Sequence, residues 1–148
     1  MELILWRHAD AAAGAPDGAR ELTGLGRTQT TKIAAWLKPR IPQPCVILVS
    51  PAKRAQQTVE ALSLPYLTDA RVGVDAMPPD VIDASGWPNR EGTVIVVGHQ
   101  PTIGRVAALV LTGRQSDWPI GAGALWWFTY RERDGLAALR AAIAPDLA

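Results

Sequence analysis

Three short runs of apolar, mostly β-branched residues are the feature that most constrains how this chain can fold. They lie within residues 2–6 and at residues 46–49 and 94–97. A strand with one solvated face alternates apolar and polar residues, whereas a strand buried on both faces is continuously apolar. Burial on both faces is typical of a parallel sheet that is covered by helices on either side. The three runs therefore predict central strands of an α/β fold.

Segments with apolar residues at helical spacing lie between and after these runs. We expect helices over residues 24–37 and 51–62, and a third from Pro101 up to Gly113. Pro39 ends the first because it removes a backbone donor. Pro51 is expected in the first turn of the second, where its missing N–H costs nothing. Gly113 is expected to stop the third.

Residues 65–90 and the C-terminal segment follow different patterns. Residues 65–90 are rich in proline and predict a loop with a short helix near 79–86, whereas 124–130 and 136–143 predict two antiparallel strands joined by a charged turn containing Asp-Gly. The alternation of strands and helices in the first 110 residues favours a three-layer α/β/α architecture, with a mostly parallel central sheet and C-terminal edge strands. No linker or repeat interrupts the chain, so we expect one domain over residues 1–148.

Composition excludes several functional classes. The chain has 148 residues, and 15 Lys and Arg against 14 Asp and Glu give a net charge of +1, which disfavours bulk nucleic-acid binding. Cys45 is the single cysteine, so a disulfide framework cannot form and a reducing cytoplasm is expected. The apolar runs fall far short of the ~20 residues that cross a bilayer, so no membrane partner is expected. We interpret the six tryptophans as core and edge packing.

Both histidines of the chain fall where predicted strands end. Arg7 and His8 end the first strand, Arg54 follows the second, and His99 follows the strand at 94–97. Ligands of parallel sheets bind outside the carboxyl ends of the strands, where loops and helix N-termini converge. Helix starts at Ser50-Pro51 and Gln100-Pro101 would add backbone N–H groups and positive dipole ends. The sequence therefore predicts a phosphate-binding pocket.

Four segments resemble motifs of the histidine phosphatase superfamily, the phosphoglycerate-mutase-like proteins. They are Leu-Trp-Arg-His-Ala-Asp-Ala at 5–11, Leu-Thr-Gly-Leu-Gly-Arg at 22–27, Ser-Pro-Ala-Lys-Arg-Ala-Gln-Gln-Thr at 50–58 and Val-Gly-His-Gln-Pro at 97–101. Together they extend over about residues 1–111. The small size and the Gly-His-Gln-Pro form are most similar to the SixA-type phosphohistidine phosphatase branch. The resemblance implies a phosphoglycerate-mutase-like fold.

The resemblance also implies a metal-independent phosphatase that needs no cofactor. His8 would be the nucleophile, because a neutral imidazole can attack phosphorus and hold the group as phosphohistidine until water hydrolyses it. Arg7 and Arg54 would bind phosphate oxygens with forked donors. His99, if protonated, would complete this clamp, and backbone N–H groups around Gln100 would add to it.

Members of the superfamily that act on phosphomonoesters use a Glu or Asp as general acid, and no residue here stands in such a motif. Asp75 and Asp80 lie in the region of the chain where the general acid is expected, but we interpret both as surface residues. Asp10 is expected to hold the loop beside the nucleophile in place. Arg20 lies in a loop that the resemblance places near the phosphate, and its contact with substrate is left open. A nitrogen leaving group is already protonated near neutral pH, so a site without the acid favours N–P substrates.

Three functional hypotheses follow. The first is dephosphorylation of phosphohistidine in a partner protein, and the second is the same chemistry on a small phosphorylated metabolite. The third is a degenerate module that binds phosphate without turnover, which the intact Arg7-His8 and Arg54-His99 pairs disfavour. A mutase is less favoured, because the short chain lacks room for insertions that would exclude water. The oligomeric state is left open.

Overall fold

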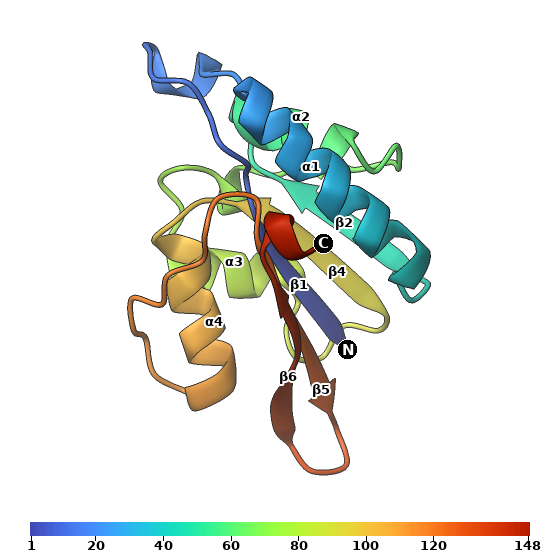
Figure 1. Cartoon of the computed structure of the whole chain (residues 1–148). Helices are drawn as coiled ribbons and strands as arrows, with labels where there is room; N and C mark the ends of the chain where they lie inside the picture. The colour runs from blue at the N-terminus through green and yellow to red at the C-terminus, as the bar shows by residue number, and fades with distance from the viewer.

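The computed structural model describes residues 1–148 and contains a single six-stranded sheet, in the order β3-β2-β4-β1-β5-β6 (Figure 1). The strands are β1 (Glu2–Arg7), β2 (Cys45–Val49), β3 (Leu67–Thr68), β4 (Thr93–Gly98), β5 (Leu125–Arg131) and β6 (Leu136–Ile143). The first four in sheet order run parallel, and β5 and β6 add antiparallel strands on the β1 side. The predicted mostly parallel sheet with a C-terminal antiparallel hairpin is confirmed.

Helices cover both faces of the sheet, which explains why the central strands are continuously apolar. The helices are α1 (Gly24–Leu37), α2 (Lys53–Glu60), α3 (Pro78–Ser85) and α4 (Thr102–Thr112). In β1, Leu3 and Leu5 pack into the core that contains side chains of α3 and α4. Ile4 and Trp6 pack into the opposite core, with side chains of α1 and α2. Figure 1 shows these two helix pairs on opposite faces, so the three-layer architecture is confirmed.

The predicted bounds of α1 are correct, but those of α2 are wrong at both ends. Thr23 caps α1 by accepting a hydrogen bond from Gly26 N at 3.0 Å. The second helix was expected over 51–62 and spans Lys53–Glu60 instead. Ser50 Oγ accepts a hydrogen bond from Ala52 N at 3.1 Å, which turns the chain before the helix begins. Pro51 therefore precedes the helix and does not occupy its first turn.

The other helices begin within one residue of their predicted positions, and two short elements between residues 65 and 90 were not predicted. Pro101 is the N-cap of α4 and lies just outside it, while Gly113 ends that helix with a φ of 75° as expected. The loop at 65–90 contains α3, one residue earlier than predicted, and also β3 and a 3₁₀ turn at Ala70–Val72, which the sequence did not indicate. Trp6 and Trp127 are buried and the other tryptophans pack against the cores, so the packing interpretation is confirmed.

Gly104 allows α4 to pack directly against the chain that leads to β5. A Cβ at this position would overlap the carbonyl oxygen of Trp118. The side chain of Gln100 stabilises this packing, because it donates to Trp118 O and accepts from Gly104 N, both at 2.8 Å. We expect Gly104→Ala to lower the free energy of unfolding, measured by urea denaturation, by about 1–3 kcal/mol.

The matched control is Gly24→Ala at the start of α1, where an added Cβ meets open space. Alanine is the better helix former, so this variant should be as stable as the wild type or slightly more stable. Equal stability of the Gly104→Ala and Gly24→Ala variants would show that the α4 contact is not tightly packed.

Candidate active site

The carboxyl ends of the parallel strands bring Arg7, His8, Arg54 and His99 together. In the register of β1 and β4, Arg7 lies opposite Gly98, so His8 and His99 leave the sheet side by side. Their ring centroids are 5.1 Å apart. Arg54, in the first turn of α2, reaches both rings, with Nε 3.3 Å from His8 Nε2 and a terminal nitrogen 3.4 Å from His99 Nδ1.

His8 is held with one ring nitrogen free to accept. Its Nδ1 lies 2.8 Å from the carbonyl oxygen of Ala9, which can only accept, so Nδ1 carries the proton. Nε2 therefore has the lone pair and faces the N–H of Arg54. Burial is the main cause that lowers the pKa of His8 to about 4; the positive charges of Arg54, Arg7 and Arg20 contribute to this shift, and the Ala9 hydrogen bond opposes it. The imidazole is neutral at neutral pH.

His99 is also neutral in the ligand-free site. Burial is the main cause that lowers its pKa to about 3; the neighbouring His8, Arg54 and Arg7 contribute to this shift, and the charge of Asp17 opposes it. The protonated form considered from the sequence therefore requires a bound anion, whose negative charge would favour the imidazolium.

The two low pKa values can be tested directly by NMR, because the chain has two histidines. We expect the ring C–H shifts of the folded protein to stay constant from pH 8 to about pH 5.5 and to move only as the pH approaches 4. The unfolded chain should titrate near 6.5, so acid should destabilise the fold from about that pH downward. A titration midpoint near 6.5 for either ring of the folded protein would contradict the buried, cation-rich site.

Arg54 is buried and fixed by several acceptors. Only 4% of the residue is exposed, and its terminal nitrogens donate to the carbonyl and carboxylate oxygens of Asp17 at 2.9 and 3.1 Å. Asp17 is exposed and also binds Arg20 at 3.1 Å, and hydrogen bonds from Arg20 and then Arg54 lower its pKa. Asp17 could not be selected from the sequence, because it lies in a short 3₁₀ turn, Asp17–Ala19, that carries no motif.

The guanidinium of Arg7 has one nitrogen held by the backbone and another whose N–H has no acceptor. One terminal nitrogen donates to the carbonyl oxygen of Ile120 at 2.9 Å, which orients the guanidinium. Its Nε is buried and has no hydrogen-bond partner within the protein. Buried donors without acceptors are rare and costly, and an anion bound beside Arg7 would satisfy this one.

Neighbouring polar residues hold the loops of the site in place. Thr58 Oγ1 accepts from Ala9 N at 3.1 Å and donates to Arg54 O at 2.7 Å, which joins α2 to the segment after β1. Asp10 accepts a hydrogen bond from the Thr23 hydroxyl at 2.5 Å, in agreement with the loop-fixing role expected for it. Arg20 donates to Ala12 O and Asp17 and makes no hydrogen bond to either histidine.

Two backbone N–H groups at the start of α4 are already satisfied. Ile103 N donates to the carbonyl oxygen of His99, and Gly104 N donates to the side chain of Gln100. The N–H of Gln100 itself makes no hydrogen bond to the backbone.

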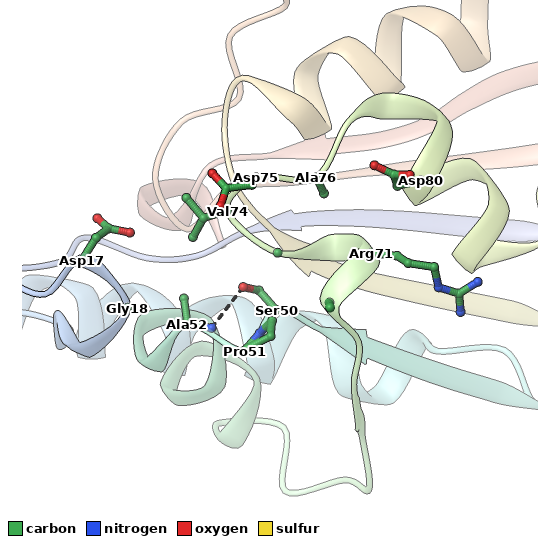
Figure 2. Close-up of a pocket in the computed structure, with 12 residues that line it drawn as sticks. Asp17, Gly18, Ser50, Pro51, Ala52, Arg71, Val74, Asp75, Ala76 and Asp80 are labelled. Carbon is green, nitrogen blue, oxygen red and sulfur yellow. Dashed lines mark hydrogen bonds between the residues drawn. The ribbon is translucent and has the colours of Figure 1, made fainter.

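A cleft of about 850 Å³ opens beside Ser50 and Asp17, which contact His99 and Arg54 (Figure 2). Asp75 and Asp80 line this cleft; Asp75 is exposed and Asp80 is partly exposed, so both lie at the surface as expected. Asp80 accepts a hydrogen bond from Met77 N at 2.8 Å and so caps α3. The Asp75 carboxylate has no hydrogen-bond or ion-pair partner, and neither residue is hydrogen-bonded to the four site residues.

Comparisons with known proteins agree with this geometry. The model of the histidine phosphatase superfamily (branch 1) matches residues 3–72. Phosphohistidine phosphatase SixA of Escherichia coli is 35% identical over 124 residues, 76% of each chain. A structure of the protein histidine phosphatase SixA complexed with tungstate has a TM-score of 0.84 and 26% identity, covering 99% of this chain and 98% of that one. Phosphoserine phosphatase of Entamoeba histolytica has a TM-score of 0.73 at 17% identity, covering 97% and 96%.

With two histidines and two arginines gathered at the strand ends of this fold, the chain belongs to the histidine phosphatase superfamily and is a phosphatase. Within the superfamily it is of the SixA type.

Proposed function

We propose that His8 is the nucleophile of a two-step phosphoryl transfer. Its Nε2 attacks phosphorus, the bond to the leaving group breaks, and water then hydrolyses the phosphohistidine to inorganic phosphate. The observation that carries the proposal is the orientation of the ring: the proton is held at Nδ1 by Ala9 O, and the lone pair of Nε2 is directed at Arg54. No separate base is needed, because the imidazole is already neutral.

Arg7, Arg54 and His99 are proposed to stabilise the charge on the transferred group. Phosphoryl transfer depends mainly on positioning and electrostatics, and guanidinium groups match phosphate oxygens with paired donors. Arg54 already lies within hydrogen-bond distance of His8, and its contacts with Asp17 hold it there. His99 would gain a proton at Nδ1 on the arrival of the anion and then donate to an oxygen.

The substrate we propose is phosphohistidine in a partner protein. Cleavage of its N–P bond releases a nitrogen base that is protonated near neutral pH, so it requires little help from an acid. No carboxylic acid is hydrogen-bonded to the two histidines. The Escherichia coli relative carries the name phosphohistidine phosphatase. We also propose that residues 1–148 form one histidine phosphatase domain acting in the cytoplasm; no helix has the length and apolar character to span a membrane.

Rates on a panel of substrates test this proposal. With EDTA present throughout, we expect phosphohistidine to be hydrolysed fastest, p-nitrophenyl phosphate more slowly and alkyl phosphates slowest, because the leaving groups become progressively harder to expel without protonation. Asp75→Asn and Asp80→Asn should each leave phosphohistidine hydrolysis nearly unchanged. A general acid is worth about 10²–10⁴-fold, so a true donor would be evident.

The alternative is a phosphatase of small phosphorylated metabolites, and one observation favours it. Asp75 lines the cleft with its carboxylate unpaired, where it could protonate an alkoxide. Equal rates on aryl and alkyl phosphates, together with a hundredfold loss in Asp75→Asn, would make this the preferred function. Absence of turnover on every substrate, with tungstate still bound, would indicate a module that only binds phosphate.

A further inference from the structure

Ser50 makes a contact with His99 that the phosphatase mechanism above does not use. It follows β2 directly and is fully buried, and its Oγ lies 2.7 Å from His99 Nε2. This is the shortest of the hydrogen bonds around the two histidine rings. Ser50 lies beside the cleft but has no exposed surface, so its hydroxyl contacts only the protein groups packed around it.

The backbone and hydroxyl of Ser50 are fixed from three sides. Its N–H donates to Val97 O of β4 at 3.1 Å, and its carbonyl oxygen accepts from the Gln56 side chain at 2.8 Å. Its Oγ accepts from Ala52 N at 3.1 Å. Ser50 is therefore held in place by contacts with β4 and with the start of α2. Its Oγ is a fixed acceptor for the His99 ring.

The contacts on the other ring nitrogen fix the tautomer of His99. Arg54 can only donate, so His99 Nδ1 is the acceptor of its 3.4 Å contact. In the neutral ring the proton is then on Nε2, which donates it to Ser50 Oγ. Ser50 thus directs Nδ1 toward Arg54 and His8.

We propose that Ser50 is a positioning residue for phosphoryl transfer, which holds His99 by Nε2 so that Nδ1 faces the phosphoryl group. When a phosphate monoanion binds, its hydroxyl proton passes to Nδ1, which leaves a dianionic phosphate and an imidazolium. Nδ1–H then donates to a phosphate oxygen, while Nε2–H stays on Ser50 Oγ. The hydroxyl oxygen serves as acceptor in both states. This inference rests on the role proposed for His99 and holds for any phosphorylated substrate.

Removal of the hydroxyl leaves a buried ring N–H without an acceptor, so the ring loses its fixed orientation. We expect Ser50→Ala to lower kcat/KM for p-nitrophenyl phosphate and to weaken tungstate binding, each by about 10–100-fold. Nitrogen NMR of the ligand-free variant should show a mixture of His99 tautomers, whereas the wild type should show the Nε2–H form alone.

Ser85→Ala is the matched control. Ser85 is also a fully buried serine whose hydroxyl makes two hydrogen bonds, to Ile82 O and from Trp87 N, but it lies at the end of α3. This variant should lose stability to a similar degree while keeping wild-type kcat/KM and tungstate affinity. Thermal unfolding of both variants shows whether each remains folded under the assay conditions.

A double-mutant cycle on tungstate affinity decides the proposal. If Ser50 acts through His99, Ser50→Ala should change the affinity by less than about threefold when introduced into His99→Ala. An equal loss in both backgrounds, or wild-type affinity and tautomer in Ser50→Ala, would overturn it. Tungstate binding does not require turnover, so the cycle gives an answer even if the wild type does not hydrolyse phosphohistidine. That result would count against the proposed substrate and not against the role of Ser50.

Discussion

His8→Ala should abolish turnover on every phosphorylated substrate while leaving the fold intact. Loss of a nucleophile that forms a covalent intermediate removes the whole two-step route, and comparable losses in other enzymes reach about 10⁶-fold, so we expect at least a 10⁴-fold fall in kcat. The side chain is partly exposed at a strand end, and its two hydrogen bonds are to its neighbour Ala9 and to Arg54, so it contributes little to packing. Steady-state kinetics and circular dichroism measure the two effects.

Tungstate binding provides the internal control for this variant. Arg7, Arg54 and His99 remain in His8→Ala, so the anion should still bind, although more weakly. A variant that retains more than about a tenth of the wild-type rate would show that His8 is not the nucleophile. One that binds no tungstate and melts early would indicate misfolding, and His8→Asn would then take its place.

Arg54→Lys should reduce kcat/KM by about 10²–10³-fold, the range found when a single donor to a developing oxyanion is removed. The Arg54 guanidinium uses all three of its nitrogens at once: Nε contacts His8, one terminal nitrogen contacts the Asp17 carbonyl oxygen, and the other contacts both His99 and the Asp17 carboxylate. A lysine ammonium is a compact point charge and cannot reproduce a planar set of donors, so retention of charge should not rescue the rate. Kinetics with p-nitrophenyl phosphate and tungstate titration measure the loss.

Arg105→Lys is the control for this substitution. Arg105 lies on α4, is partly exposed and pairs with the exposed Asp117, with no hydrogen bond to the four site residues. An exposed ion pair contributes little, so this variant should match the wild type. If Arg54→Lys also kept the wild-type rate, the site would need only positive charge at this position, and the forked contact would have no catalytic role.

The architecture could be predicted from the sequence because burial on both faces leaves a clear pattern. The runs around β1, β2 and β4 are continuously apolar since alternate residues enter the two cores, as Leu3 and Ile4 do. Strand β3 and the 3₁₀ turn at Ala70–Val72 were not predicted, because they are too short to show a periodic pattern of apolar residues. Pro51 was placed in α2 because a side-chain hydrogen bond at Ser50, which delays the helix, leaves no signal in hydropathy.

The four site residues could be selected from the sequence because each lies next to the end of a predicted strand. Their partners could not, since Asp17 reaches Arg54 from a loop 37 positions away and Ser50 meets His99 across 49 positions. The cleft that Asp75 and Asp80 line could not be predicted either, because it is formed by segments distant in the chain. Contacts of this kind depend on tertiary structure and have no local sequence pattern.

Direct trapping of the intermediate is the most decisive test of the proposed mechanism. The protein would be mixed with radiolabelled phosphohistidine substrate, quenched within milliseconds in alkaline denaturant, in which phosphohistidine survives, and digested for peptide mapping. We predict label on the peptide that contains His8, attached at Nε2, and none in His8→Ala. Label on Ser50, on Asp10 or on any other residue, or equal labelling of the wild type and His8→Ala, would contradict His8 as the nucleophile.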